Sequence, residues 1–318
     1  MSSKPSVSII VPCKKMDNYT LECIDHCKRL DYPNFEIIVL PDEFTNAIDG
    51  IKIIATGPVT PGVKRNLAVK SSSGEFCAFI DNDAYPRSDW LTNALKHLED
   101  PQICGVGGPG LTPETDGFMQ KAGGYVLSSL MVGNLSSRYK PKNYFESDDI
   151  QSCNLIVRKA VIEEAGGWNE KYWPGEDTLM CLAIKKLGKK LFEASDVVVY
   201  HHRRPLFKLH LKQVSKFGEH RGYFARKYPE TSARLTYFFP SLLLLFFVSG
   251  IVISVVYPVF IYVFLSGLIL YFALSLIAVG LQVKDPRLFF FAWLGIIATH
   301  IVYGLYFLSG LLKRDLKR

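Results

Sequence analysis

The sequence predicts an α/β fold, a mostly parallel sheet with helices on both faces, followed by an α-helical membrane region. Apolar runs alternate with segments of helical periodicity over roughly the first 200 residues, which is typical of parallel strands buried on both faces. One such run, Phe76–Ile80, leads directly into two carboxylates, Asp81 and Asp83, before Pro86 ends the strand. Between Tyr237 and Val283 the chain has no charged residue, and about 20 apolar residues span a bilayer core as a helix.

The first half of the chain contains strands and helices in alternation. Apolar runs predict the strands, and apolar residues three to four positions apart predict the helices. Ser88 is expected to cap the helix whose apolar stripe includes Trp90 and Leu91. The predicted strands are 7–12, 35–40, 51–54 and 76–80, and the predicted helices are 19–30, 62–73 and the one after Ser88.

This pattern stops between Pro109 and Asp149, a stretch rich in Gly, Pro and Tyr. A long connection within a compact domain predicts a functional loop, and a disordered insertion is the alternative. Order is expected to resume with residues 150–157. The segments expected to follow are a short helix at 159–165, a helix that starts at Gly175-Glu176-Asp177 and ends at Gly188, and a strand at 197–200.

The charge and the cysteines narrow the class of protein. The net charge is +7, of which +4 comes from residues beyond position 237, and 7 − 4 leaves +3 for the first 236 residues. Such a mildly basic soluble part predicts no nucleic-acid partner. The seven cysteines all precede the apolar region and include no Cys-x-x-Cys pair. They are therefore expected to be reduced, buried thiols of a cytoplasm-facing domain.

Asp81 and Asp83 are the strongest chemical signal. Two unit charges about 4 Å apart repel by roughly 4 kcal/mol at an effective dielectric near 20, and a divalent cation removes that cost. Aspartate oxygens suit Mg²⁺ or Mn²⁺, and ligands of open α/β sheets sit at the carboxyl ends of strands. The prediction is a metal site that holds a substrate phosphate, and a solvated Asp-Asn-Asp turn is the alternative.

The end of the chain is expected to meet a membrane. Residues 206–227 predict one amphipathic helix with lysines every four residues, placed either in the headgroup layer or against the domain surface. The 47 uncharged residues 237–283 fit two spans with a hairpin at Tyr257-Pro258, and Leu288–Leu312 fits a third.

The basic residues near these spans predict an orientation. The positive-inside rule places the first domain and the loop with Lys284 and Arg287 in the cytoplasm, as expected for a multi-pass protein of the cell membrane. Three spans would leave the basic tail, Lys313–Arg318, outside, which conflicts with the same rule. Either one apolar segment does not fully cross, or the tail is tolerated outside.

Over residues 5–230 the chain resembles the family 2 glycosyltransferases, which have a GT-A nucleotide-diphospho-sugar transferase fold. Each motif alone is weak, but the ordered set is specific. The resemblance implies a GT-A domain at 1–205, an interfacial region at 206–236 and membrane helices at 237–318. The motifs are Val7–Pro12, Leu40-Pro41-Asp42, Lys64-Arg65-Asn66-Leu67-Ala68 before Ser73-Gly74-Glu75, Phe79-Ile80-Asp81-Asn82-Asp83, Ala165-Gly166-Gly167-Trp168, Gly175-Glu176-Asp177 and Val199-Tyr200-His201-His202.

The resemblance implies a site for a UDP- or GDP-linked sugar. Asp81 and Asp83 match the family's DxD motif, so Asp83 is expected to bind Mg²⁺ or Mn²⁺ and Asp81 the ribose or the metal. Asp42 is expected to contact the nucleotide base, and Pro12 and Arg65 are expected to lie near the nucleotide.

His202 is expected to be a third metal ligand, because neutral imidazole binds Mn²⁺, and His201 competes for that role. Arg203 and Arg204 are expected to pair with the diphosphate or with lipid headgroups. Arg221 lies where processive members carry a Gln-x-x-Arg-Trp motif and is expected near the acceptor. The absence of that motif predicts transfer of a single sugar.

Asp177 matches the family's catalytic base. Inversion needs a carboxylate that takes the proton of the acceptor hydroxyl, and a helix N-terminus keeps such a carboxylate ionised. Glu176 is expected to contact the acceptor or hold the loop. Trp168 and Trp173 are expected to stack on a sugar face, or else to be core or lid aromatics.

The leading interpretation is an inverting, metal-dependent transfer of one sugar to a lipid-linked or cell-surface glycan at the cytoplasmic membrane face. A polyprenyl-phosphate sugar synthase is the alternative, because a phosphate acceptor is already an anion. A sugar nucleotidyltransferase would need a glycine-rich loop where the chain has Pro12-Cys13-Lys14-Lys15. A non-catalytic membrane-anchored scaffold would not need Asp81, Asp83 and Asp177 together.

Overall fold

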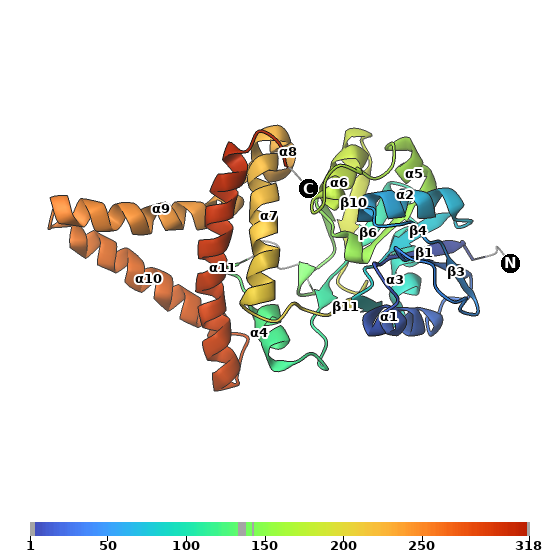
Figure 1. Ribbon diagram of the computed structural model, residues 1–318, viewed down its shortest axis with the longest axis horizontal. Coiled ribbons are helices and arrows are strands. Elements are labelled where there is room, and N and C mark those ends of the chain that lie inside the picture. Colours follow the sequence, from blue (N-terminus) through green and yellow to red (C-terminus); the bar gives the residue numbers. More distant parts are fainter. Residues whose placement is uncertain (1–3, 133–137, 142, 317–318) are drawn as a thin grey trace. The chain divides into compact units, whose positions relative to one another are not determined.

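The computed structural model describes residues 4–132, 138–141 and 143–316. It has the expected α/β sheet followed by long C-terminal helices (Figure 1). The chain forms two compact units, the first made of Met1–Pro113 and Ser137–His202 and the second of Glu114–Ser136 and Arg203–Arg318. The expected domain boundary at 205 lies close to the boundary between the units, whereas the sequence pattern places residues 114–136 with the first domain.

The first unit is built on an eight-stranded sheet of β1 (Val7–Pro12), β2 (Phe35–Leu40), β3 (Ile51–Ile53), β4 (Phe76–Phe79), β6 (Ile103–Gly107), β8 (Phe145–Ser147), β9 (Leu155–Arg158) and β10 (Lys190–Glu193). Its order is β3-β2-β1-β4-β9-β6-β10-β8. Most pairs are parallel, but β9 runs antiparallel to both β4 and β6, and β8 runs antiparallel to β10. A smaller sheet has the order β5-β11-β7 and consists of β5 (Ala84–Pro86), β11 (Val199–His201) and β7 (Gly110–Leu111).

Helices cover both faces of the large sheet, as predicted. α1 (Asn18–Lys28) and α3 (Trp90–His97) cover one face, while α2 (Pro61–Ser71), α5 (Lys159–Glu164) and α6 (Glu176–Lys186) cover the other (Figure 1). Successive residues of β4 therefore enter different cores: Phe76 and Ala78 pack with α1 and α3, and Cys77 and Phe79 pack with the other three helices. This double burial explains why the strand is apolar throughout.

Several local predictions are confirmed and others are wrong. The predicted strands at 7–12 and 35–40 match β1 and β2, and all seven cysteines are buried and free. Asp89, not Ser88, is the N-cap residue of α3, and no side chain caps that end. The stretch between Pro109 and Asp149 is not a bare loop, because it contains β7, α4 (Phe118–Leu127) and β8. Strands β6 and β10 were not expected from the pattern.

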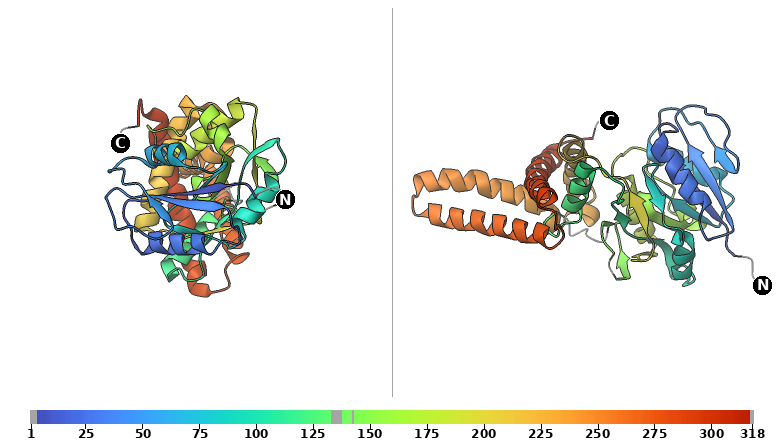
Figure 2. Two further views of the ribbon diagram at one scale, coloured as in Figure 1. Left: turned by 90° about the vertical axis from the view of Figure 1, so that its right-hand side faces the viewer. Right: turned by 90° about the horizontal axis from the view of Figure 1, so that it is seen from below.

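The second unit is helical. It contains α4, α7 (Lys208–Lys227), the short α8 (Pro229–Ser232), α9 (Leu235–Val256), α10 (Phe260–Gly280) and α11 (Pro286–Leu312). The last three are long and apolar enough to cross a membrane. α9 and α10 form the predicted hairpin, whose turn includes Tyr257 and Pro258 (Figure 2).

α7 and α11 lie side by side and run in the same direction. Their backbones approach closely at glycines, because a Cβ on Gly218 would meet the carbonyl oxygen of Tyr303 at 2.8 Å, and one on Gly222 would collide with that of Phe307. The Nε2 of His210 and the Oγ1 of Thr299 are 2.9 Å apart near the beginning of the pair. Lys313 and Glu219 form an ion pair of 2.6 Å near its end.

We expect Gly222→Ala to lower the melting temperature of the detergent-purified protein, because overpacking a tight contact costs about 1–3 kcal/mol. Gly280→Ala is the matched control, since a Cβ there would meet no atom closer than 3.6 Å and alanine favours a helix by up to about 1 kcal/mol. Equal melting temperatures for the two variants would contradict the close packing of α7 on α11.

Candidate functional site

A cluster of metal-ligating groups lies where β4 ends. Asp81 and Asp83 follow this strand, and His201 is the last residue of β11, which pairs with β5 immediately after Asp83. One ligand atom from each of these three residues lies within 4.8 Å of the others. The Nε2 of His201 is 3.2 Å from Oδ1 of Asp83. Two carboxylates and one imidazole form a donor set that fits a divalent metal ion.

The structure brings His201 to the two aspartates, where the sequence favoured His202. The backbone N–H of His202 donates to the carbonyl of Asp83 over 2.9 Å, but its ring points elsewhere: its Nε2 is 2.9 Å from Oε2 of Glu22 and it lies against Tyr19. Alternation along a strand turns neighbouring side chains to opposite sides. A one-residue difference in strand register therefore decides which histidine joins the cluster.

Lys64 ties together the carboxyl ends of β1 and β2. It is buried, and its ammonium group donates to the carbonyls of Cys13 (2.6 Å) and Leu40 (3.0 Å) and to Oδ1 of Asp42 (2.5 Å). The Asp42 carboxylate is thus fixed at the edge of the sheet next to Pro12, whose strand partner is Leu40. The sequence reasoning missed this lysine, since a charged residue on a helix is usually solvated and nothing in its neighbours marks it as buried.

Arg65 is the cation at the centre of the site. It is 2% exposed, and its guanidinium donates to Asp81 over 3.1 Å and to Glu176 over 2.7 Å. The same group lies over the ring of Trp168, 4.8 Å from its centroid. Arg65 therefore joins the end of β4 to the first residue of α6.

Asn66 holds the loop that leads to α6. Its side chain accepts a hydrogen bond from the N–H of Trp168 over 2.7 Å and donates to the Trp168 carbonyl over 2.9 Å. Gly167 has φ +82°, and a Cβ on it would press on the Asn66 amide at 2.8 Å. Trp168 itself is buried, edge-on to Phe79 at 4.7 Å. It is therefore placed as a core aromatic rather than as a sugar platform, whereas Trp173 is half exposed.

Glu176 and Asp177 open α6 with different environments. Glu176 is buried, and burial raises its pKa to about 7 against the opposing effect of Arg65. Asp177 is partly exposed, and its Oδ1 accepts a hydrogen bond from the N–H of Thr178 over 2.8 Å. It lies close enough to interact electrostatically with Arg65 and Asp81.

Two of the expected acceptor residues belong to the second unit. Arg203 is buried, its N–H donates to the Asp116 carboxylate over 3.0 Å, and its carbonyl accepts from Gln120 over 2.9 Å. Arg221 lies over the ring of Tyr237, 4.9 Å from its centroid.

Comparison with known proteins shows which proteins this chain is similar to. Residues 8–164 match the family described as Glycosyl transferase family 2. A protein of Methanococcus voltae, dolichyl N-acetyl-alpha-D-glucosaminyl phosphate 3-beta-D-2,3-diacetamido-2,3-dideoxy-beta-D-glucuronosyltransferase, is 23% identical over 241 residues, which cover 70% of this chain and 74% of that protein. Glycosyltransferase AglE of Haloferax volcanii is 25% identical over 226 residues, covering 67% of this chain and 72% of its own length.

A similar solved structure is the mannosyltransferase PcManGT from Pyrobaculum calidifontis in complex with GDP-Man and Mn²⁺. The two chains align with a TM-score of 0.57 and 17% identity, and the alignment covers 99% of this chain and 89% of the other. At this identity the likeness establishes the fold.

We expect Arg65→Met to destabilise the protein strongly at pH 8, where Glu176 is ionised. Removing one partner of a buried ion pair costs roughly 3–5 kcal/mol, because Glu176 must then either stay charged without its partner or take up a proton, its pKa no longer lowered by Arg65. Adding Glu176→Gln to this variant should restore part of the melting temperature. The check is to compare the melting temperatures of the unmodified protein, the two single variants and the double variant by differential scanning fluorimetry. Purely additive effects would contradict the coupling between Arg65 and Glu176.

Proposed function

Because residues 8–164 make this chain a family 2 glycosyltransferase, we propose that it transfers a single sugar, with inversion, from a nucleoside diphosphate sugar to a lipid-linked or cell-surface glycan. The observation that carries the proposal is the cluster of Asp81, Asp83 and His201 at the end of a buried strand. Arg65 links this cluster to Glu176, the first residue of α6.

The donor is proposed to bind at the carboxyl ends of β1, β2 and β4. Asp83, Asp81 and His201 would hold Mg²⁺ or Mn²⁺ together with the donor diphosphate. The metal, when bound, stabilises the negative charge that develops on the leaving nucleoside diphosphate. Asp42, fixed by Lys64 over 2.5 Å, would accept a hydrogen bond from the nucleotide base, with Pro12 beside it.

Asp177 is proposed as the general base. Its carboxylate takes the proton of the acceptor hydroxyl while the acceptor oxygen bonds to the anomeric carbon of the sugar. The bond from that carbon to the diphosphate breaks, and its electron pair leaves with the phosphate oxygen. Glu176 is held by Arg65 over 2.7 Å and would position the loop. Trp173, half exposed and three residues before Glu176, is proposed to contact a sugar.

The acceptor is proposed to be a sugar linked to a polyprenyl phosphate. The name of the Methanococcus voltae relative states a dolichyl-phosphate-linked sugar as its acceptor, and three apolar helices make membrane association expected here. We propose that the catalytic domain faces the cytoplasm in a multi-pass protein, where Arg203 and Arg221 would contact the acceptor or lipid headgroups. Direct transfer to polyprenyl phosphate is the second candidate, because it also fits a membrane acceptor.

Replacing Asp83 tests the donor site. We expect isothermal titration calorimetry to detect binding of GDP or UDP to the purified protein in the presence of Mn²⁺ and to detect none after chelation. Asp83→Asn should abolish this metal-dependent binding, because a carboxamide is a poor ligand for a divalent cation. Asp25→Asn is the matched control, since Asp25 is exposed and pairs with Arg29 on the surface of α1. Equal nucleotide affinities in the two variants would overturn the assignment.

Replacing Asp177 tests the base and distinguishes the acceptors. With a hydroxyl acceptor, Asp177→Asn should lower kcat by about 10²–10⁴-fold, as expected for loss of a general base. Nucleotide affinity should stay unchanged, because Asp177 does not hold the donor. Near-normal turnover with a polyprenyl phosphate acceptor would instead favour the synthase, since that acceptor is already an anion. The measurement is transfer of radiolabelled sugar to each acceptor class.

A further inference from the structure

The packing of α7 against α11 bears on which helices cross the membrane. All three apolar helices are long enough, yet they differ in what surrounds them. In the most apolar stretch of α11, 33% of the residues are buried inside the protein. The corresponding shares are 11% for α9 and 17% for α10. Few residues of α9 and α10 are therefore buried, while α11 is partly covered by other helices of its unit.

The helix that covers α11 is heavily charged. α7 contacts α11 from His210 opposite Thr299 to Glu219 opposite Lys313, so α7 runs along the second half of α11. If α11 crossed the bilayer, α7 would have to enter the hydrocarbon with it, although charged side chains in that region are costly. These charged side chains of α7 are Lys208, Lys212, Lys216, Glu219, Arg221, Arg226 and Lys227.

The side of α11 opposite α7 is apolar and exposed. Phe290 (51% exposed), Ile301, Leu305 (50%) and Leu312 (82%) recur at intervals of 11, 4 and 7 residues, which places them along one face of the helix. The residues that meet α7, such as Tyr303 and Phe307, lie on another face. α11 therefore offers one apolar face to its surroundings, while its other face is covered by α7, which carries the charged side chains.

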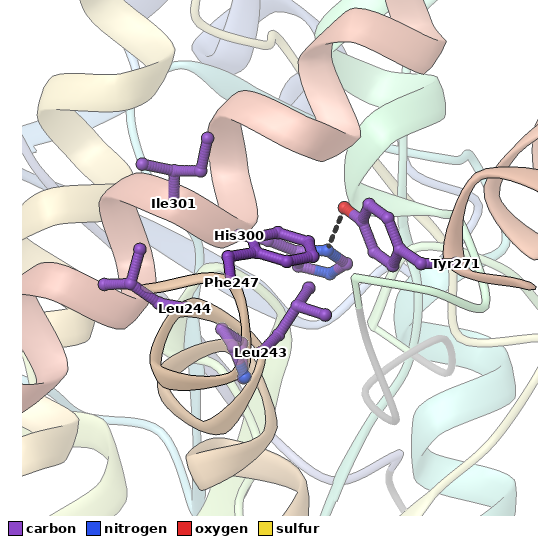
Figure 3. A pocket seen from close by; sticks show the side chains of 7 residues that line it. Leu243, Leu244, Phe247, Tyr271, His300 and Ile301 are labelled. Atoms are coloured by element: carbon purple, nitrogen blue, oxygen red, sulfur yellow. Dashed lines mark hydrogen bonds between the residues drawn. The ribbon is translucent and has the colours of Figure 1, made fainter. Parts of the chain in front are cut away.

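The hairpin of α9 and α10 projects away from α11, on the side of α11 opposite α7 (Figure 1). Polar bonds fix the hairpin to α11: Ser241, near the start of α9, donates to the carbonyl of Gly304 over 3.0 Å, and in the middle of α10 the hydroxyl of Tyr271 is 2.9 Å from Nδ1 of His300 (Figure 3). Its tip is exposed and apolar, with Val259 79% exposed. Each of its helices has 21 or more residues, enough to span the hydrocarbon core.

We propose that α9 and α10 alone cross the bilayer, and that α11 lies in the headgroup layer with Phe290, Ile301, Leu305 and Leu312 facing lipid and α7 stacked on its other side. Two crossings return the chain to the side from which it entered. The loop with Lys284 and the tail that starts at Lys313 then lie on the same side as the lysines of α7, in accord with the positive-inside rule. This topology goes beyond the proposed function and does not depend on sugar transfer.

Cysteine labelling with a membrane-impermeant maleimide tests the topology. Lys284→Cys, Arg314→Cys and Val259→Cys would be expressed separately in a bacterial host and labelled in inside-out vesicles and in intact spheroplasts. The unmodified chain is the control for background, since its seven cysteines are buried. Lys284→Cys and Arg314→Cys should be labelled from the same face, and Val259→Cys from the other. Labelling of Arg314→Cys from the face opposite Lys284→Cys would overturn the proposal.

Spin-label depth measurements keep the proposal testable if a labelling variant fails to fold. Labels at Phe290, Ile301, Leu305 and Leu312 should show similar, shallow depths from their oxygen and nickel-chelate accessibilities in vesicles. Labels at Leu242, Val248 and Val255 of α9 are the matched set for a crossing helix and should differ strongly in depth. A maximum of depth at Ile301 and Leu305, with Phe290 and Leu312 shallow, would overturn the interfacial position of α11.

Discussion

The buried guanidinium of Arg65 is the interaction on which the candidate site depends. It holds Asp81 at the end of β4 and Glu176 at the start of α6, two residues that are far apart in the sequence. Burying a charge of this kind is tolerable only when opposite charges and hydrogen bonds surround it. The neighbours of Arg65 on α2 extend the same function, since Lys64 fixes Asp42 and Asn66 fixes the loop before α6. Three consecutive residues of α2 therefore fix the acids at the edge of the sheet and the loop before α6 relative to one another.

This arrangement explains why a site of several acids can exist at the edge of an apolar sheet. Parallel pairing brings the carboxyl ends of β1, β2 and β4 to the same edge, and each strand delivers its polar residue there. The cations come from α2, and a divalent metal would supply the remaining positive charge beside Asp83. Asp81 belongs both to the ion pair with Arg65 and to the Asp-Asp-His cluster. Burial raises the pKa of Glu176 to about 7, against the opposing effect of Arg65.

The parts of the fold that could be predicted are those in which one local signal suffices. Long apolar runs marked β1 and β2, and Tyr257-Pro258 marked the hairpin because proline breaks a helix. The wrong or missing predictions concern features that depend on contacts between residues distant in the sequence. β9 pairs antiparallel with β4 and β6, and no periodicity reports strand direction. The choice of His201 over His202 depends on the register of β11 on β5, and the burial of Lys64 depends on carbonyls that only the folded sheet brings together.

The membrane region shows the same limit more generally. Hydropathy records that a side chain avoids water, but not whether lipid or protein surrounds it. α11 is nearly as apolar as its neighbours, yet Gly304 and Gly310 let the backbones of α9 and α7 approach it closely. Small residues of this kind are characteristic of helix contacts, whereas a lipid-facing surface needs none. The position of the charged helix α7 supplies what hydropathy alone cannot, because the side of α11 that α7 covers cannot contact lipid.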